Sequence, residues 1–277
     1  MKKLTLLTAL LISFSCFAQG KKLDKIADEI TREGTALYKS EMASWNGTDI
    51  VLAKFPDKRD NLGGYFSYVV DNKATCIFYS KGDSPKVIAS VTFDTTYSNA
   101  TARIDGLERD FSATEKEYYT IRSKALNRIR EDTLFKVYKN TDLNLIPIIK
   151  GNEKKVYVLT GPKNDGVVIF GNDYLITFDK NDEIKDEKKI HKNIMFIDIN
   201  AKGENDSVKV TGSMHMHLPE TGEYITATDI CTLMLYEKYT PWEQHIVVSE
   251  KYMSIWMCKT NKLVIVSKDA LNKIDKQ

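Results

Sequence analysis

The chain has 277 residues, with 40 Lys and Arg residues against 38 Asp and Glu residues, and a formal net charge of +2. Its apolar fraction of 42% and charged fraction of 28% are typical of a soluble globular protein of one or two domains. Because the charges nearly balance and no long basic run occurs, the composition argues against nucleic acid or an anionic lipid surface as the partner.

The first residues have the pattern of a secretory signal peptide. Two lysines precede an apolar run over 4–17, which small residues close at Ala18. This run is shorter than the about 20 residues that a membrane-spanning helix needs, and no later segment approaches that length. We therefore expect a signal peptide over 1–18 and an exported chain, periplasmic or extracellular, with a lipoprotein anchored through Cys16 as the alternative.

The middle of the chain alternates between helical and strand patterns. A helical period runs over 22–44 and ends at the turn-forming sequence WNGTD. Three strand-like runs then predict an antiparallel meander, at 64–70, 74–80 and 86–93. A capping box formed by Ser112 and Glu115 opens a second, charged amphipathic helix. Four further strands are expected at 155–161, 166–171, 174–179 and 190–199.

The last third of the chain predicts a strand, a helix and three more strands. The strand over 207–218 alternates, so that His215 and His217 share one face while Met214 and Met216 share the other. The helix that follows has Thr226 or Thr228 as its cap and Asp229 in its first turn. The closing strands are expected at 245–249, 252–256 and 262–267. Together these patterns predict an α+β fold with a mainly antiparallel sheet and flanking helices.

The histidines and the aspartate of this region suggest a metal site. His215 and His217 can present two imidazoles to one point, and Asp229 can add a carboxylate if the turn between strand and helix folds back. Two histidines and one carboxylate leave the fourth position of zinc open for water, and Thr226 could assist the developing oxyanion. The alternative is that the two histidines lie on a solvent-exposed polar face and that Asp229 only caps its helix.

The same stretch resembles the JAMM metallopeptidase family. That family carries His-x-His-Pro at the end of a strand and then Ser-x-x-Asp at the start of a helix. Here His215-Met216-His217 is followed by Leu218-Pro219 and by Thr226-Ala227-Thr228-Asp229, with one extra residue, Leu218, in the spacing. The segment HIVVSEKYMSIW, at 245–256, is similar to the strands that follow this helix in RadC-type members, where a histidine begins one strand.

The resemblance implies a fold, a site and an activity. The fold would be a JAMM/cytidine-deaminase-like core, a single domain over 19–277 in which 133–200 is a strand-rich insertion. His215, His217 and Asp229 would be zinc ligands, and Thr226 would replace the family's serine. The protein would be an exported zinc-dependent hydrolase of peptide or isopeptide bonds, acting on a peptide or protein substrate.

The general base is the part of the family's site that the sequence does not place. Asn61 stands where the family's upstream glutamate is expected, which leaves Glu41, the preferred candidate, and Asp60. If neither reaches the metal, the chain would instead be a non-catalytic bacterial envelope protein that binds a partner through a JAMM-like fold. Outside the motif, His191 is expected to have structural partners and His245 to pack in the core or support a ligand. Cys76, Cys231 and Cys258 are expected to be buried thiols rather than a disulfide framework, with a single Cys231–Cys258 bridge as the alternative.

Overall fold

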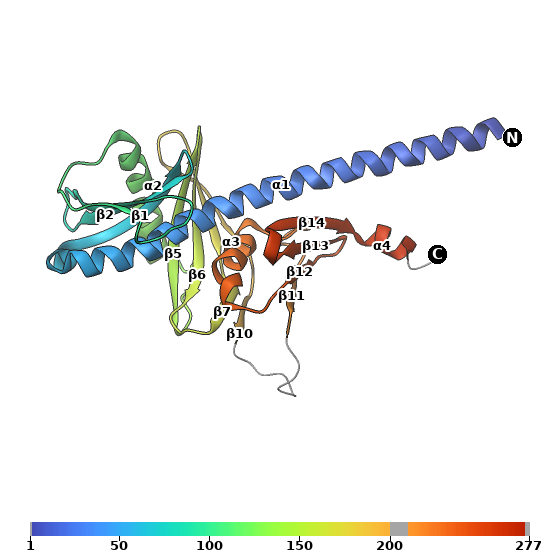
Figure 1. Ribbon diagram of the computed structural model, residues 1–277. Helices are drawn as coiled ribbons and strands as arrows, with labels where there is room; N and C mark the ends of the chain where they lie inside the picture. The colour runs from blue at the N-terminus through green and yellow to red at the C-terminus, as the bar shows by residue number, and fades with distance from the viewer. Residues whose placement is uncertain (1, 200–209, 275–277) are drawn as a thin grey trace. The chain divides into compact units, whose positions relative to one another are not determined.

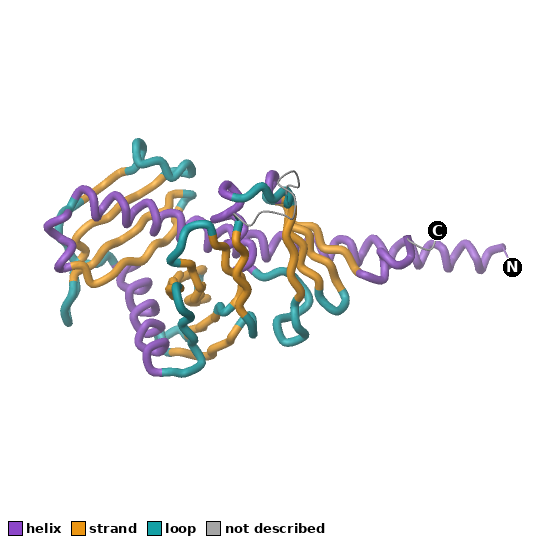
Figure 2. The backbone as a smooth tube through the Cα atoms, turned by 90° about the horizontal axis from the view of Figure 1, so that it is seen from below, coloured by secondary structure: helices purple, strands orange, loops and turns teal. Residues whose placement is uncertain are grey.

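A computed structural model describes residues 2–199 and 210–274 of the chain (Figure 1). The chain divides into two compact units. Unit 1 contains Met1–Gly34 and Lys202–Gln277, and unit 2 contains Thr35–Ala201. Among the described residues, strands outnumber helices, as the tube coloured by secondary structure shows (Figure 2).

Helix α1, Lys2–Lys54, contributes to both units. The predicted helix over 22–44 is confirmed, but its predicted end at WNGTD is wrong, because the helix continues through these residues. Asn46 donates its side-chain amide to Met42 O at 2.8 Å, and Thr48 donates its hydroxyl to Ser44 O at 2.7 Å. Gly47 lies where a Cβ would be 3.0 Å from the Cβ of Cys76. The turn-forming residues are therefore accommodated by bonds within the helix and by close packing on a strand.

The first sheet of unit 2 confirms the predicted meander. Its strand order is β1-β2-β3-β4, all antiparallel. The strands are β1 (Leu62–Val70), β2 (Lys73–Ser80), β3 (Val87–Phe93) and β4 (Arg103–Asp105), and the 3-10 helix η1 (Pro56–Asn61) precedes them. Ser67 on one face lies 2.8 Å from Ser44 of α1, oxygen to oxygen. Phe66, which points to the other face, stacks on Tyr118 of α2. The sheet is thus covered by α1 on one side and by α2 on the other.

Helix α2, Ala113–Glu131, begins with the capping box that the sequence predicts. It also packs against the second sheet of unit 2, whose strand order is β5-β6-β8-β9. The remaining strands of this unit are β5 (Thr141–Lys150), β6 (Glu153–Pro162), β7 (Val167–Gly171), β8 (Tyr174–Phe178), β9 (Ile184–Lys189) and β10 (Ile194–Asp198), with β7 and β10 forming a separate antiparallel pair. The predictions omit β5, which contains Pro147. A proline has no backbone N–H to donate, and it fits here because β5 lies at the edge of its sheet.

The described residues of unit 1 form one sheet, in the order β11-β12-β13-β14. Its elements are β11 (Gly212–Met216), α3 (Ala227–Tyr236), η2 (Glu237–Tyr239), β12 (Gln244–Val248), β13 (Tyr252–Met257), η3 (Cys258–Thr260), β14 (Lys262–Ser267) and α4 (Lys268–Ile274). Strands β11 and β12 are parallel, and the later pairs are antiparallel. A parallel pair needs a crossover connection, and α3 provides it. The start of α3 lies over one face of the sheet, where Ile225 N donates to Ser254 Oγ at 3.2 Å.

The structure confirms the α+β class with mainly antiparallel strands. The JAMM/cytidine-deaminase-like core and the boundaries 1–18, 19–277 and 133–200 stay predictions. Among the described residues, none of the helices combines the length and apolar character that a membrane crossing requires. Cys76, Cys231 and Cys258 are buried free thiols, as predicted.

Candidate metal centre

Strand β11 carries His215, and His217 follows directly after its end. The side chain of His215 is 10% exposed and that of His217 is fully buried. On the opposite face of the same strand, Met214 is 57% exposed and Met216 is 75% exposed. The predicted alternation is therefore confirmed, and it is the histidine face that the fold buries. This contradicts the alternative in which the two histidines are solvated.

Helix α3 supplies the carboxylate. Thr226 is the cap residue, its side chain accepts from Asp229 N, and the Asp229 carboxylate accepts from Thr226 N at 2.9 Å. This capping box fixes the carboxylate at the first turn, where its charge also suits the positive end of the helix dipole. Asp229 is 1% exposed. The helix cap thus holds a buried carboxylate in one orientation.

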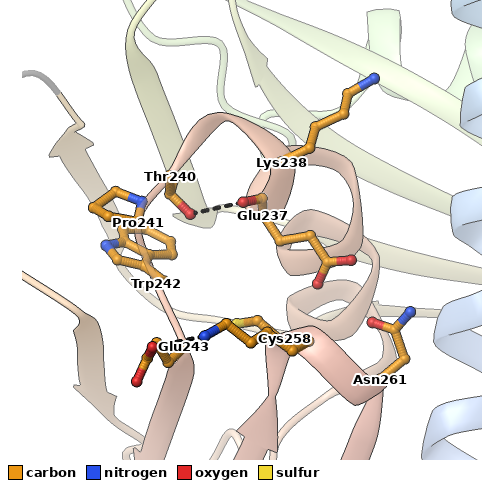
Figure 3. A pocket seen from close by; sticks show the side chains of 9 residues that line it. Glu237, Lys238, Thr240, Pro241, Trp242, Glu243, Cys258 and Asn261 are labelled. Carbon is orange, nitrogen blue, oxygen red and sulfur yellow. Dashed lines mark hydrogen bonds and ion pairs between the residues drawn. The ribbon is translucent and has the colours of Figure 1, made fainter.

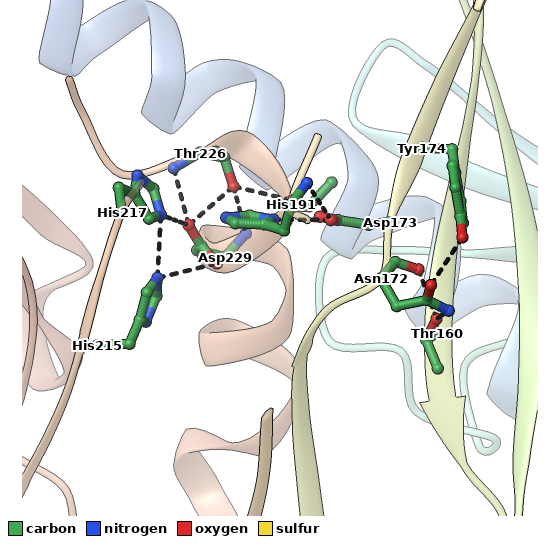
Figure 4. A network of polar contacts seen from close by, with 10 residues as sticks. Thr160, Asn172, Asp173, Tyr174, His191, His215, His217, Thr226 and Asp229 are labelled. Atoms are coloured by element: carbon green, nitrogen blue, oxygen red, sulfur yellow. Dashed lines mark hydrogen bonds and ion pairs between the residues drawn. The ribbon is translucent and has the colours of Figure 1, made fainter. Parts of the chain in front are cut away.

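The three side chains converge (Figure 4). The Nε2 atoms of His215 and His217 lie 3.0 Å apart, His217 Nε2 lies 3.4 Å from Asp229 Oδ2, and His215 Nε2 lies 3.8 Å from Asp229 Oδ1. Ligand atoms bound tetrahedrally to zinc at about 2.0–2.1 Å are roughly 3.3 Å apart. The observed separations, 3.0 to 3.8 Å, are close to this value, with the two imidazoles facing different oxygens of the Asp229 carboxylate. His215, His217 and Asp229 could therefore hold a metal ion, as their chemistry also suggests.

Behind His215, two more residues continue the polar chain. His245 Nε2 lies 2.9 Å from His215 Nδ1, and His245 Nδ1 lies 2.7 Å from Ser213 Oγ. His245 is completely buried. Burial and the neighbouring His215 lower the pKa of His245 to about 3, so its imidazole is neutral. The prediction that His245 packs in the core or supports a ligand is consistent with this position. Ser213 was not among the predicted site residues, although its place two residues before His215 puts it on the same strand face.

No protein-family model matches this chain, and neither does any curated protein or solved structure. The likeness to JAMM metallopeptidases therefore stays a resemblance carried by the motif, and the identification of the centre depends on its own geometry.

The two predicted base candidates belong to unit 2. Glu41 is 4% exposed and accepts from Asn144 Nδ2 at 3.2 Å. Burial raises the pKa of Glu41 to about 7, and the charge of Arg122 and the bond from Asn144 only partly oppose this. Asp60 is exposed in η1, where its backbone oxygen accepts from Lys81 Nζ at 2.8 Å. The roles of both as general base stay predictions.

The predictions for His191 and Thr226 can each be compared with contacts inside the unit that contains the residue. In unit 2, His191 Nδ1 lies 2.7 Å from Asp173 Oδ1, which confirms that this histidine has a structural partner. In unit 1, the Thr226 hydroxyl donates to Asp229 Oδ2 at 2.8 Å. Its proton is thus used to orient the carboxylate in this structure, and its assistance to an oxyanion stays a prediction.

A surface pocket of about 380 Å³ also lies in unit 1, lined by Glu237, Lys238, Thr240, Pro241, Trp242, Glu243, Cys258, Lys259 and Asn261 (Figure 3). Burial raises the pKa of Glu237 to about 7. None of the three candidate metal ligands lines this pocket, so it is distinct from the metal centre.

Proposed function

We propose that this chain is a zinc-dependent hydrolase of peptide or isopeptide bonds, with His215, His217 and Asp229 as the metal ligands. The observation that supports it most is the convergence of the three side chains described above, two imidazoles from β11 and its end and one carboxylate from the helix cap. A zinc ion held there would lower the pKa of a water molecule to about 7 and polarise a carbonyl, the two requirements of amide hydrolysis.

Zinc is preferred to other metals on ligand chemistry. Two imidazoles with one carboxylate form the ligand set of many catalytic zinc sites. The same set with several open positions also suits non-haem iron(II). Metal analysis decides between the two.

A third base candidate lies in the same unit as the centre. Glu33 of α1 is half-buried and precedes Gly34. A Cβ on Gly34 would lie 2.6 Å from the Cβ of Ile230 and 2.9 Å from Ala227 O. The backbone of α1 therefore touches the first turn of α3, the turn that carries Asp229. This close approach also explains a glycine inside a helix, where it costs about 1 kcal/mol relative to alanine. We include Glu33 with Glu41 and Asp60 as base candidates.

The first experiment measures metal content. The purified full chain is expected to carry about one zinc ion, measured by mass spectrometry after extensive dialysis. Asp229→Asn and His217→Ala are expected to lose it. The matched control is Glu115→Gln, which changes a capping-box carboxylate of α2 and should keep the metal. Absence of zinc from the wild type, or equal zinc in the Asp229→Asn variant, rejects the proposal.

The second experiment measures hydrolysis. Zinc-loaded protein is incubated with a panel of fluorogenic peptides and isopeptide-linked peptides. Glu33→Gln, Glu41→Gln and Asp60→Asn should each keep the metal, and the variant that lacks the base should lose activity by about 10²–10⁴-fold. A protein that binds zinc but cleaves nothing in the panel would favour the second function, a non-catalytic envelope protein that binds a partner.

A further inference from the structure

Ser213, His245 and His215 form a series of hydrogen-bonded side chains behind the metal centre, and the pairing of β11 with β12 explains their order. Ser213 and His215 are two residues apart on β11, so their side chains share a face. His245 lies on the parallel strand β12, directly beside Ser213 in the strand register. The imidazole of His245 therefore lies between the serine hydroxyl and the imidazole of His215, at the bond distances given above.

A neutral imidazole has one N–H donor and one lone-pair acceptor, so each hydrogen bond in this chain constrains the next. If His215 uses Nε2 as a metal ligand, its proton must be on Nδ1. That proton points to His245 Nε2, 2.9 Å away, which must then carry a lone pair. The proton of His245 is consequently on Nδ1, facing Ser213 Oγ at 2.7 Å. The opposite direction would place a proton on His215 Nε2 and remove the lone pair that a metal needs.

We propose that His245 is a positioning residue of the metal centre: it accepts the Nδ1 proton of His215, commits His215 Nε2 to the metal, and is itself oriented by Ser213. This inference depends on the metal site proposed above and adds to it two residues that never touch the ion. Metal-binding histidines commonly donate their other N–H to a fixed acceptor, and loss of that acceptor weakens metal binding by about 10–100-fold. Here the acceptor is a neutral imidazole rather than a carboxylate or a carbonyl.

The surroundings of His245 suit this role. It is completely buried, and the ring of Trp242 lies 6.3 Å from it, centroid to centroid. Trp256, which is opposite His245 on β13, is also completely buried. Aromatic neighbours restrict the orientations of the ring, so its two nitrogens stay aligned with Ser213 and His215.

The experiment compares zinc affinities, measured by competition with a chromophoric chelator, in four full-length variants. His245→Leu removes the acceptor and should weaken zinc binding by about 10–100-fold. His245→Gln offers an amide oxygen near the position of Nε2 and should recover most of the loss. Ser213→Ala should weaken binding less than His245→Leu does. Val247→Ala is the matched control, because Val247 lies beside His215 in the register and is buried but cannot accept a hydrogen bond.

Nitrogen-15 NMR of the imidazoles in the zinc-loaded wild type gives a second, independent result. His215 and His245 are both expected to carry their proton on Nδ1. Protonation of His245 on Nε2 overturns the proposal, as does a His245→Leu affinity equal to that of the Val247→Ala control.

The two failures can be told apart. If the wild type binds zinc and only the His245 result is negative, the positioning role is wrong and the metal site stands. If the wild type binds no zinc, the proposed function fails and this role fails with it. Circular dichroism of each metal-free variant verifies that the fold is retained, and the nitrogen-15 NMR of the wild type serves as the test if His245→Leu does not fold.

Discussion

Helices α2 and α3 both begin with a capping box, but the buried carboxylates of the two boxes, Glu115 and Asp229, face different partners. In both, a hydroxyl residue caps the helix and the acidic residue three positions later bonds back to the cap backbone. Glu115 of α2 then receives two hydrogen bonds from the Arg109 guanidinium, at 2.6 and 2.8 Å. Asp229 of α3 instead faces the ring nitrogens of His215 and His217, at 3.8 and 3.4 Å.

This difference separates a structural site from a candidate functional one. A guanidinium brings its own positive charge and two parallel donors, so it completes the site of Glu115. Burial alone would raise the pKa of Glu115, but the bonds from Arg109 and from the cap backbone outweigh it and hold that pKa below its ordinary value. Imidazoles, in contrast, offer lone pairs to a common point. A carboxylate and two lone pairs at one point form a set of ligands for a cation.

The largest expected effect is that of metal removal, which should affect only the α3 site. A ligand present at 1,000 times its Kd stabilises a protein by about 4 kcal/mol. We therefore expect a strong chelator to lower the free energy of unfolding by about this amount relative to zinc-saturated protein, as measured by denaturant titration. Asp229→Asn should abolish the response to the chelator, whereas Glu115→Gln should retain it. An equal response in both variants would remove the distinction between the two capping boxes.

A third buried carboxylate, Glu41, extends the comparison. Its pKa is raised from 4.5 to about 7, so the folded state favours the protonated form. The resulting stabilisation is complete below pH 4.5 and is lost as the pH rises through 7, where burial of the ionised group costs up to about 3 kcal/mol. Glu41→Gln keeps an oxygen that can accept from Asn144 and should gain stability relative to wild type between pH 4 and pH 9. Unfolding curves across this range test it, and a gap that does not change with pH would contradict the raised pKa.

The next prediction concerns Arg109. Arg109→Met leaves Glu115 buried without its guanidinium and should cost about 2 kcal/mol at neutral pH. Because the pKa of Glu115 is lowered in the folded protein, this stabilisation is present above the unfolded pKa and disappears as the pH falls through the folded pKa. The loss should therefore shrink in acid, in a series of unfolding measurements. The double variant Arg109→Met, Glu115→Gln should recover part of it, and none of these changes should alter zinc affinity.

The sequence predicts the components of the centre better than their surroundings. The alternation along β11 places His215 and His217 on one face, and the Thr226-x-x-Asp229 spacing gives the capping box, because both are local patterns. Which face is buried is decided by packing. Met214 and Met216, the apolar residues, are the exposed ones, since the start of α3 covers the histidine side. No local pattern contains that information.

The participation of Ser213, which sequence analysis missed, and the partner of His245 depend on a contact between strands. Ser213 and His245 become neighbours because β11 and β12 are parallel, a pairing created by the α3 crossover. Likewise, judged from its neighbours in the sequence alone, Gly34 only lowers the helix propensity of the segment around it. Its actual environment is the first turn of α3, almost 200 residues later in the chain. The end predicted for α1 failed for a similar reason, because Gly47 packs on Cys76.

The smallest expected effects are those of removing the two capping hydroxyls, Ser112 of α2 and Thr226 of α3, and they compare the two capping boxes most directly. Ser112→Ala and Thr226→Ala each remove a capping hydroxyl and should each cost about 1 kcal/mol of stability. Only Thr226→Ala should also weaken zinc binding, because the Thr226 hydroxyl donates to Asp229 Oδ2 and thereby orients the carboxylate. We expect a loss of about threefold to tenfold, equivalent to about 1 kcal/mol. Thr226→Ser keeps the hydroxyl and should behave like wild type in a chelator competition. If Ser112→Ala lowered zinc affinity as much as Thr226→Ala, the effect would be one of general stability rather than of carboxylate orientation.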